Sequence, residues 1–462
     1  MRKRLGLAAL VLAAFAGAVG MGLAKTPNAA TSSGGPAVPL KRAPAAGKFV
    51  VHEWGTFTSF SGADGVRLEF RPLVDDELPG FVYNRVTQGA GWDLLGSKID
   101  ISALERMETP VTYFYVDEPR EVAAKVAFPQ GLLTEFYPPV QTMLPPFQRN
   151  KRPEIANSSL DWGKIRLLPP REFARLRRQR EEDRVASLLP AVNLPGFSEG
   201  KDQSVAKLPP LDLPAVAGDN HYAFARETDS AIVEVVDQYL QKHYEKFLFY
   251  RGLGDFPLPL SFSATEPGRF TVKNEGPDAV RDLFLVQIDG SRVRFRHAAQ
   301  VAAYGELTIE TPESYSTIDE LGEEMVQALI VTGLYEKEAR AMVKTWRSSW
   351  FGENGTRLLY LVPERITDEL LPLAIEPKPD EQLRVLVGRM ELLPPEECER
   401  LLALVGETGS CLSIEAEPLR SELVRLGRFA EPALKYLARS AKDERQRATI
   451  EQLTADLGTT MR

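Results

Sequence analysis

Short apolar runs separated by turn residues dominate the first two thirds of the chain. The runs 49–60 and 66–74 flank the turn signal SGADG, a pattern that predicts a β-hairpin. Three further runs, at 111–116, 122–128 and 132–137, are joined by short turns that contain Pro or Gly. Their spacing predicts an antiparallel meander.

Prolines interrupt the interval 138–214, which contains four Pro-Pro pairs and one charged run at 171–184. Because proline blocks both β-ladders and helix interiors, we expect a long irregular excursion with one solvated helix in it. The next segment, 228–248, has apolar residues at helical spacing. Its many Val and Tyr residues also suit two strands, so both interpretations stay open.

Five strand-like runs follow, and Asp289-Gly290 is a hairpin signal between two of them. Short strands at this density are typical of an immunoglobulin-like β-sandwich. The five runs are 258–264, 269–274, 283–288, 292–297 and 306–310.

The pattern becomes helical at Thr317, which has the spacing of a capping box with Glu320. Two helices that form a hairpin are expected next, then two strand-like runs, and helices again from Pro395 onward. The hairpin helices are 318–332 and 336–350, and the strand-like runs are 357–362 and 383–390.

These patterns predict an α+β multidomain protein with an antiparallel β-rich N-terminal body, a sandwich-like module and a mainly helical C-terminal region. The expected segments are a signal peptide at 1–24, a disordered Pro/Ala-rich linker at 25–48, a β-rich domain at 49–250, a sandwich-like module at 251–315, a helical-hairpin region at 316–394 and a helical tail at 395–462.

The N-terminus has the features of an export signal. Arg2, Lys3 and Arg4 precede an apolar stretch at 5–23, and small residues occupy the positions that signal peptidase reads. The alternative is an uncleaved anchor, because this stretch nearly reaches the roughly 20 residues that span a bilayer. We expect an exported protein in the periplasm or at the cell surface, attached to the membrane only if the segment is uncleaved.

Composition excludes several function classes. The net charge is −8, and cleavage of the signal would remove three positive charges and leave −11, which argues against nucleic acid as a partner. With 4 His and 2 Cys, the chain lacks the ligands for zinc ribbons or iron–sulfur clusters, and we expect no cofactor. Motifs of common hydrolases, metalloproteases and nucleotide-binding loops are absent.

Carboxylates are the candidate catalytic groups if the protein is an enzyme: Glu53, Glu108 and Glu135. Glu53 shares a strand face with Val51 and Phe57, and burial there would raise its pKa and suit a general acid. The other interpretation is an ion pair with an arginine of the next strand, for example Arg67 or Arg71.

Histidines offer a weaker possibility. His52 and Glu53 are strand neighbours that point to opposite faces, so a regular strand cannot bring both to one metal. A metal site would need scattered residues, and hydrogen-bonded histidines are the alternative. The candidate ligands are His52, His221 and His243, with Glu53 or Glu135; Trp54, on the face of His52, is a candidate binding residue.

Three arginines alternate along one expected strand: Arg292, Arg294 and Arg296. Their guanidinium groups share one face. This row could bind a sulfated or uronic polymer, or an anionic partner, through bidentate hydrogen bonds. The alternative is an edge strand that charge protects from aggregation.

Cys398 and Cys411 are the two cysteines of the chain. In an oxidising compartment a disulfide between them would contribute about 3 kcal/mol to stability. Two free thiols are the alternative, since Cys398 is expected on a helix.

Four segments resemble a family of exported bacterial proteins of unknown function: VHEWGTFT at 51–58, METP at 107–110, EKFLFYRG at 245–252 and VLVGR at 385–389. The resemblance implies a shared fold and export over most of 49–395, and no activity is known for the family. Residues 426–453 resemble a single HEAT repeat, which implies two antiparallel helices packed on the preceding ones.

These features favour a non-catalytic binding or scaffolding protein of the bacterial envelope. Its partner would be an envelope protein or an anionic polymer, and assembly into a larger complex is a further possibility. The competing hypothesis is an envelope hydrolase that uses the three carboxylates on polysaccharide or peptide.

Overall fold

The computed structural model describes residues 46–71, 78–85, 101–146, 154–188, 211–407 and 418–460. The chain divides into two compact units, 1–39 and 40–462, and every described residue belongs to the second. The expected signal peptide therefore lies outside the described residues. Within the described part, no helix combines the length and hydropathy needed to span a membrane.

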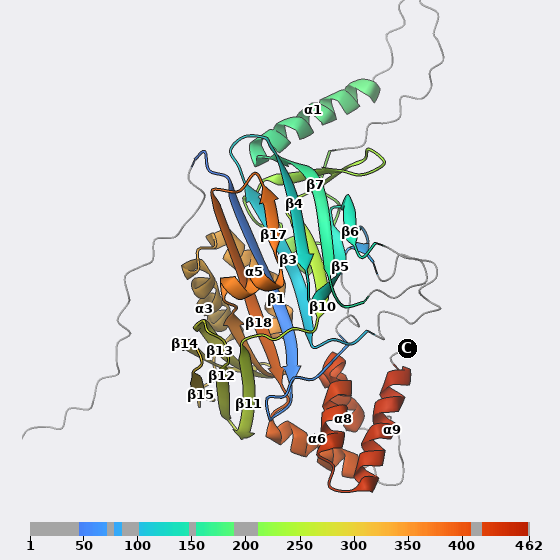
Figure 1. Cartoon of the computed structure of the whole chain (residues 1–462), viewed down its shortest axis with the longest axis vertical. Helices are drawn as coiled ribbons and strands as arrows, with labels where there is room; N and C mark the ends of the chain where they lie inside the picture. Colours follow the sequence, from blue (N-terminus) through green and yellow to red (C-terminus); the bar gives the residue numbers. More distant parts are fainter. Residues whose placement is uncertain are drawn as a thin grey trace, which may run out of the picture. The chain divides into compact units, whose positions relative to one another are not determined.

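A nine-stranded sheet is the centre of the fold, in the order β14-β13-β16-β18-β1-β3-β10-β5-β2 (Figure 1). β1 (Val50–Ser61) lies between β18 (Glu381–Leu392), which is parallel to it, and β3 (Glu105–Tyr115), which is antiparallel. All twelve residues of β1 are buried, so both faces of the sheet are covered. The other strands are β14 (Arg292–Val301), β13 (Val280–Asp289), β16 (Gly355–Leu361), β10 (Leu248–Gly254), β5 (Gly131–Tyr137) and β2 (Tyr83–Asn84).

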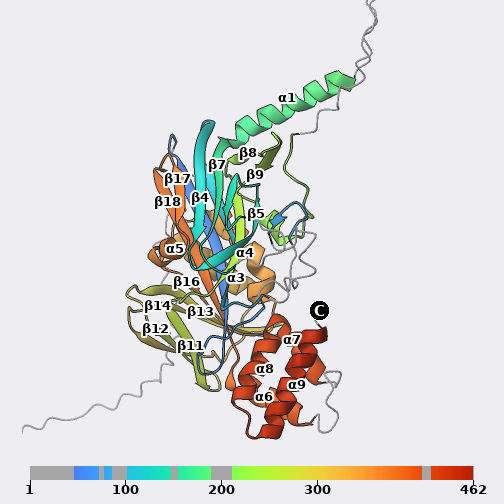
Figure 2. The same cartoon turned by 45° about the vertical axis from the view of Figure 1, so that its right-hand side comes forward.

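Helices cover one face of this sheet. α3 (Ile318–Val331) and α4 (Glu336–Phe351) pack side by side (Figure 2). The short α2 (His221–Phe224) packs against α4. The predicted capping box is confirmed, because Thr317 and Glu320 exchange both hydrogen bonds at the start of α3. Trp54 of β1 belongs to the apolar core on this face.

Two smaller sheets cover the other face. The first contains β17 (Leu373–Glu376), β4 (Arg120–Phe128), β7 (Ser158–Leu168), β8 (Ile232–Val236) and β9 (Lys242–Glu245), with β6 (Thr142–Leu144) beside β7. The second contains β11 (Leu260–Glu266), β12 (Arg269–Asn274) and β15 (Glu306–Glu310). Phe57 of β1, Trp162 of β7 and Phe262 of β11 share the core between these layers.

The C-terminal region is helical, as predicted. It contains α6 (Pro395–Glu407), α7 (Leu419–Leu426), α8 (Ala430–Arg439) and α9 (Glu444–Thr460), with a 3₁₀ turn at Gly427–Phe429. These helices have their own core, which includes Phe60 at the end of β1; the Phe60 and Phe429 rings stack with centroids 4.7 Å apart. The likeness of 426–453 to a HEAT repeat stays a prediction.

The expected mixed α+β fold with several sheets and a helical C-terminal region is confirmed, but several strand pairings were wrongly predicted. The runs at 111–116, 122–128 and 132–137 belong to β3, β4 and β5, which pair with β1, β7 and β10 instead of with one another. The run after SGADG turns back on β1 as predicted but only over a short stretch, with an antiparallel bridge between Ser61 and Arg67; the long partners of β1 are β18 and β3.

The immunoglobulin-like sandwich is not confirmed. β13 and β14 extend the nine-stranded sheet, whereas β11, β12 and β15 form a separate sheet packed across it. The reason is visible in β13, where Phe284 contacts the helical layer and Leu285 the opposite layer, so the strand needs cover on both faces.

Of the two interpretations of the segment 228–248, the two-strand one is confirmed: the segment forms β8 and β9, joined by a turn in which Leu240 has φ of 62°. One further expectation needs correction. The interval 138–214 contains the solvated helix as α1 (Pro170–Leu188), but also the buried strand β7, whose Trp162 donates to the carbonyl of Pro138 over 3.0 Å.

Gly388 on β18 tests the packing of the central sheet. A Cβ atom at this position would overlap the fully buried ring of Tyr360. We expect Gly388→Ala to lower the free energy of unfolding by about 1–3 kcal/mol, measured by denaturant titration. The control is Gly406→Ala in α6, where the new Cβ meets nothing within 4 Å and the helix gains propensity. Equal stability of Gly388→Ala and the parent would contradict the tight contact.

Candidate functional site

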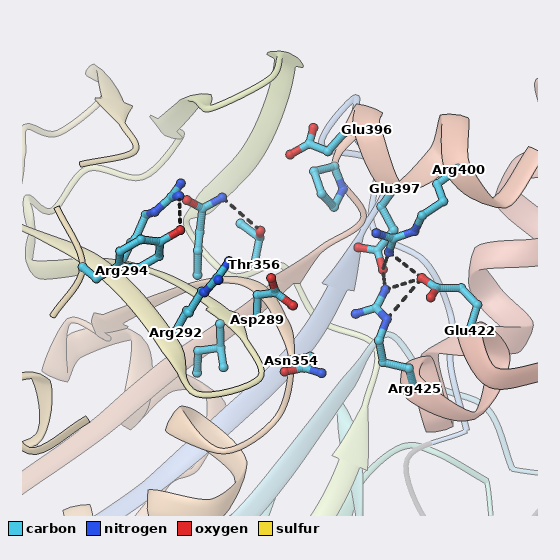
Figure 3. Close-up of a pocket in the computed structure, with 15 residues that line it drawn as sticks. Asp289, Arg292, Arg294, Asn354, Thr356, Glu396, Glu397, Arg400, Glu422 and Arg425 are labelled. Carbon is cyan, nitrogen blue, oxygen red and sulfur yellow. Dashed lines mark hydrogen bonds and ion pairs between the residues drawn. The ribbon is translucent and has the colours of Figure 1, made fainter. Parts of the chain in front are cut away.

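A pocket of about 500 Å³ lies between the β13–β14 hairpin and the helices α6 and α7 (Figure 3). Arg292 and Arg294 of β14 stand on one side. Tyr315, from the loop before α3, also lines the pocket and is hydrogen-bonded to Arg294. Arg400 of α6 and Arg425 of α7 stand on the other side. The pocket thus joins segments that are distant in the sequence.

Strand alternation positions the arginines. Val293 is buried in the core beneath the helices, and His297 stacks on Phe284 with centroids 4.1 Å apart, so the arginines that alternate with them point to the opposite face. Arg292 and Arg294 reach the pocket in this way. Arg296 does not line it, and its Nε donates to the carbonyl of Glu310 over 3.1 Å.

Tyr315 holds the first two arginines in place. Arg294 donates to the Tyr315 hydroxyl over 2.8 Å, and the guanidinium carbons of Arg294 and Arg292 lie 4.5 and 5.8 Å from its ring centroid. The hydrogen bond from Arg294 lowers the pKa of this hydroxyl, which reports a positive potential here. Within the described ranges, neither arginine forms an ion pair with a carboxylate.

On the opposite wall, the positive charges are already neutralised by glutamates. Glu422 pairs with Arg400 at 2.5 Å and with Arg425 at 2.6 Å, and Glu397 contacts both arginines (Figure 3). Asp289 and Glu396 add exposed carboxylates to the lining. The positive charge available to a ligand is therefore that of Arg292 and Arg294, and the neighbouring carboxylates can accept hydrogen bonds from the same ligand.

Glu53 forms an ion pair, but with a different partner from those expected. Its carboxylate is 2.6 Å from Arg384 of β18 and accepts hydrogen bonds from Thr112 at 2.9 Å and from Tyr250. The arginines named from the sequence pair elsewhere: Arg67 with Glu105, and Arg71 with Glu431.

The other two candidate catalytic carboxylates are also buried and bonded. Glu108 lies 3.2 Å from Arg106 and 3.0 Å from Arg428. Burial alone would raise the pKa of Glu108, but these guanidinium groups outweigh it and lower the pKa to about 2. Glu135 accepts from Asn84 at 3.2 Å and from Thr134. Glu53, Glu108 and Glu135 do not line the pocket.

The histidines occupy separate places. His52 bonds to Glu338 of α4 through Nδ1 at 2.8 Å, and His243 bonds to Asp237 through Nε2 at 3.1 Å. His221 is the first residue of α2. Among the described residues, no three His, Cys, Asp or Glu side chains gather as a metal site would require.

Trp54 is fully buried against Tyr113, with centroids 5.8 Å apart, so it is a core residue and offers no surface to a partner. Cys398 is half-buried, and its thiol lies 3.8 Å from the carbonyl oxygen of Leu393. Cys411 lies outside the described residues, and the disulfide therefore stays a prediction.

Comparison with known proteins adds little. No family model matches the chain, and no curated protein matches it. Among solved structures, the chain aligns with the yeast delta-COP-I mu-homology domain complexed with Dsl1 WxWxV peptide, at 7% identity over 76% of this chain and 98% of that chain. The TM-score of 0.22 is too low to support an inference about fold or function.

Glu108 allows a test of the buried ion pairs. Glu108→Gln leaves Arg106 and Arg428 without their carboxylate, and we expect the free energy of unfolding at pH 7 to fall by about 3–5 kcal/mol. Because the folded pKa of about 2 lies below the unfolded value of 4.5, the contribution of Glu108 is complete above pH 4.5 and is lost as the pH falls toward 2.

The measurement is denaturant unfolding of both proteins between pH 2 and 7. The difference between parent and variant should shrink below pH 4.5, while the exposed control Glu313→Gln should match the parent throughout. A difference that stays constant with pH would contradict the lowered pKa of Glu108.

Proposed function

We propose that the protein is a non-catalytic binding protein that recognises an acidic ligand in the pocket beside β14. The observation that carries this proposal is the pair Arg292 and Arg294, fixed against Tyr315 and without a carboxylate partner among the described residues. Guanidinium groups bind carboxylate, sulfate and phosphate through two parallel hydrogen bonds. Holding them on a strand also reduces the entropy lost on binding.

The arginines elsewhere in the fold make this pair distinctive. Arg384, Arg389 and Arg357 are buried and each pairs with a glutamate, as a structural arginine must. Arg292 is exposed and Arg294 is half-buried at a pocket, where a ligand can reach them. We therefore assign a binding role to these two and a structural role to the buried arginines.

The export signal and the resemblance to exported proteins support a place in the bacterial envelope for this activity. There the ligand would be an anionic polymer or an acidic segment of an envelope protein. An envelope hydrolase is less well supported, since a glycosidase needs two carboxyl groups about 5–10 Å apart across a cleft. Glu53, Glu108 and Glu135 are instead held in buried hydrogen bonds and ion pairs.

The test measures the binding of oligogalacturonate and of poly-glutamate by titration calorimetry, at low and at physiological salt. Neutral dextran is the uncharged control. We expect the double variant Arg292→Ala and Arg294→Ala to bind acidic ligands about tenfold more weakly or worse, because charged hydrogen bonds are lost at both positions. Binding by the parent should weaken as salt is added.

Arg296→Ala is the matched control, since this arginine lies on the same strand but outside the pocket lining. It should bind as the parent does. Full binding by the double variant, or an equal loss in Arg296→Ala, would show that the acidic ligand does not use this pocket.

A further inference from the structure

A second cavity of about 220 Å³ adjoins the pocket. The two cavities share four lining residues, and we call the smaller one the inner chamber. Glu397 and Arg425 are among the shared residues, so their ion pair stands at the junction. Asn354 and Gly355 complete the shared lining.

The inner chamber differs from the pocket in its chemistry. Much of its wall is apolar and comes from the end of the central sheet, from the last residue of α7 and from the turn after it: Phe60, Leu392, Leu393, Leu426 and Phe429. A cavity of about 150 Å³ lined by such side chains binds benzene. The inner chamber therefore has room for one aromatic or branched aliphatic side chain.

Charged residues of the inner chamber are already satisfied. Glu353 pairs with Arg389 at 2.5 Å, Glu391 with Arg357 at 2.8 Å, and Arg428 with Glu108 at 3.0 Å. A second charged group of the ligand would find no free partner there and would lose its hydration. An apolar group loses no such interaction and gains burial against the phenylalanine and leucine side chains.

We infer that the ligand is an acidic segment of a partner protein, with a carboxylate that binds Arg292 and Arg294 and a nearby aromatic or large aliphatic side chain that enters the inner chamber. This inference rests on the proposed function and specifies its ligand. A polysaccharide of uronic acids supplies the carboxylates but no side chain for the inner chamber. A peptide supplies both, and its backbone amides can donate to Asp289 and Glu396 at the pocket.

A peptide display library tests the inference without assuming the spacing between the two groups. It carries two fixed glutamates with randomised flanking positions and is selected against the full chain. We expect enrichment of Phe, Trp, Tyr, Leu or Met at one preferred distance from the glutamates. A synthetic peptide from this pool should bind at least tenfold more tightly than the same peptide with Gly at that position.

Two variants separate the cavities. Leu426→Trp fills the inner chamber, and the smaller change Leu426→Phe, at the same residue, which lines the inner chamber but not the pocket, keeps the test valid if the first variant unfolds. Either folded variant should remove the tenfold advantage of the apolar residue while binding the Gly peptide and oligogalacturonate as the parent does. The Arg292→Ala and Arg294→Ala double variant should weaken the binding of all three ligands: the selected peptide, the Gly peptide and oligogalacturonate.

The outcomes distinguish this inference from the proposed function. Enrichment of acidic residues alone, or tighter binding of oligogalacturonate than of any selected peptide, overturns the peptide inference and leaves acidic-ligand binding intact. A library without enrichment also overturns it. If neither peptide nor oligogalacturonate binding depends on Arg292 and Arg294, the inference and the proposed function fail together.

Discussion

A central strand that is buried on both faces carries two ionisable side chains, and much of the fold serves to satisfy them. Glu53 faces the layer of smaller sheets and is bonded by Arg384, whereas His52 faces the helical layer and is bonded by Glu338. Leaving either group buried without its partner would cost several kcal/mol. Both partners belong to the C-terminal half of the chain, so β1 is complete only when β18 and α4 are in place.

This dependence explains which parts of the fold can be predicted from the sequence. The positions of β11, β12, β15, α3 and α4 follow from local apolar patterns and, for α3, from the capping pair at Thr317. Strand pairing does not follow, because the apolar run of β1 is compatible with any neighbour, and its parallel partner β18 is more than 300 residues away. β7 was hidden by the prolines around it, although its buried residues alternate with more exposed ones along half its length.

The candidate site, too, could be predicted from the sequence only in part. Alternation along β14 predicted that Arg292, Arg294 and Arg296 share a face, but only the tertiary structure separates the two that line the pocket from the one that bonds to Glu310. Tyr315, Arg400, Glu422 and Arg425 have no motif that would connect them with β14 in the sequence. The prediction that Glu53 forms an ion pair was right in kind, and the partner was missed because it depends on the parallel pairing of β1 with β18.

The stacking of Phe429 on Phe60 joins the helical region to the end of β1, and α6 and α7 of that region supply a full wall of the pocket. A chain that has been synthesised only as far as β18 would have the arginines on their strand but nothing opposite them. The pocket therefore forms only once α6 and α7 have been added to the sheet. Any ligand that needs both walls distinguishes molecules that contain these helices from molecules cut before them.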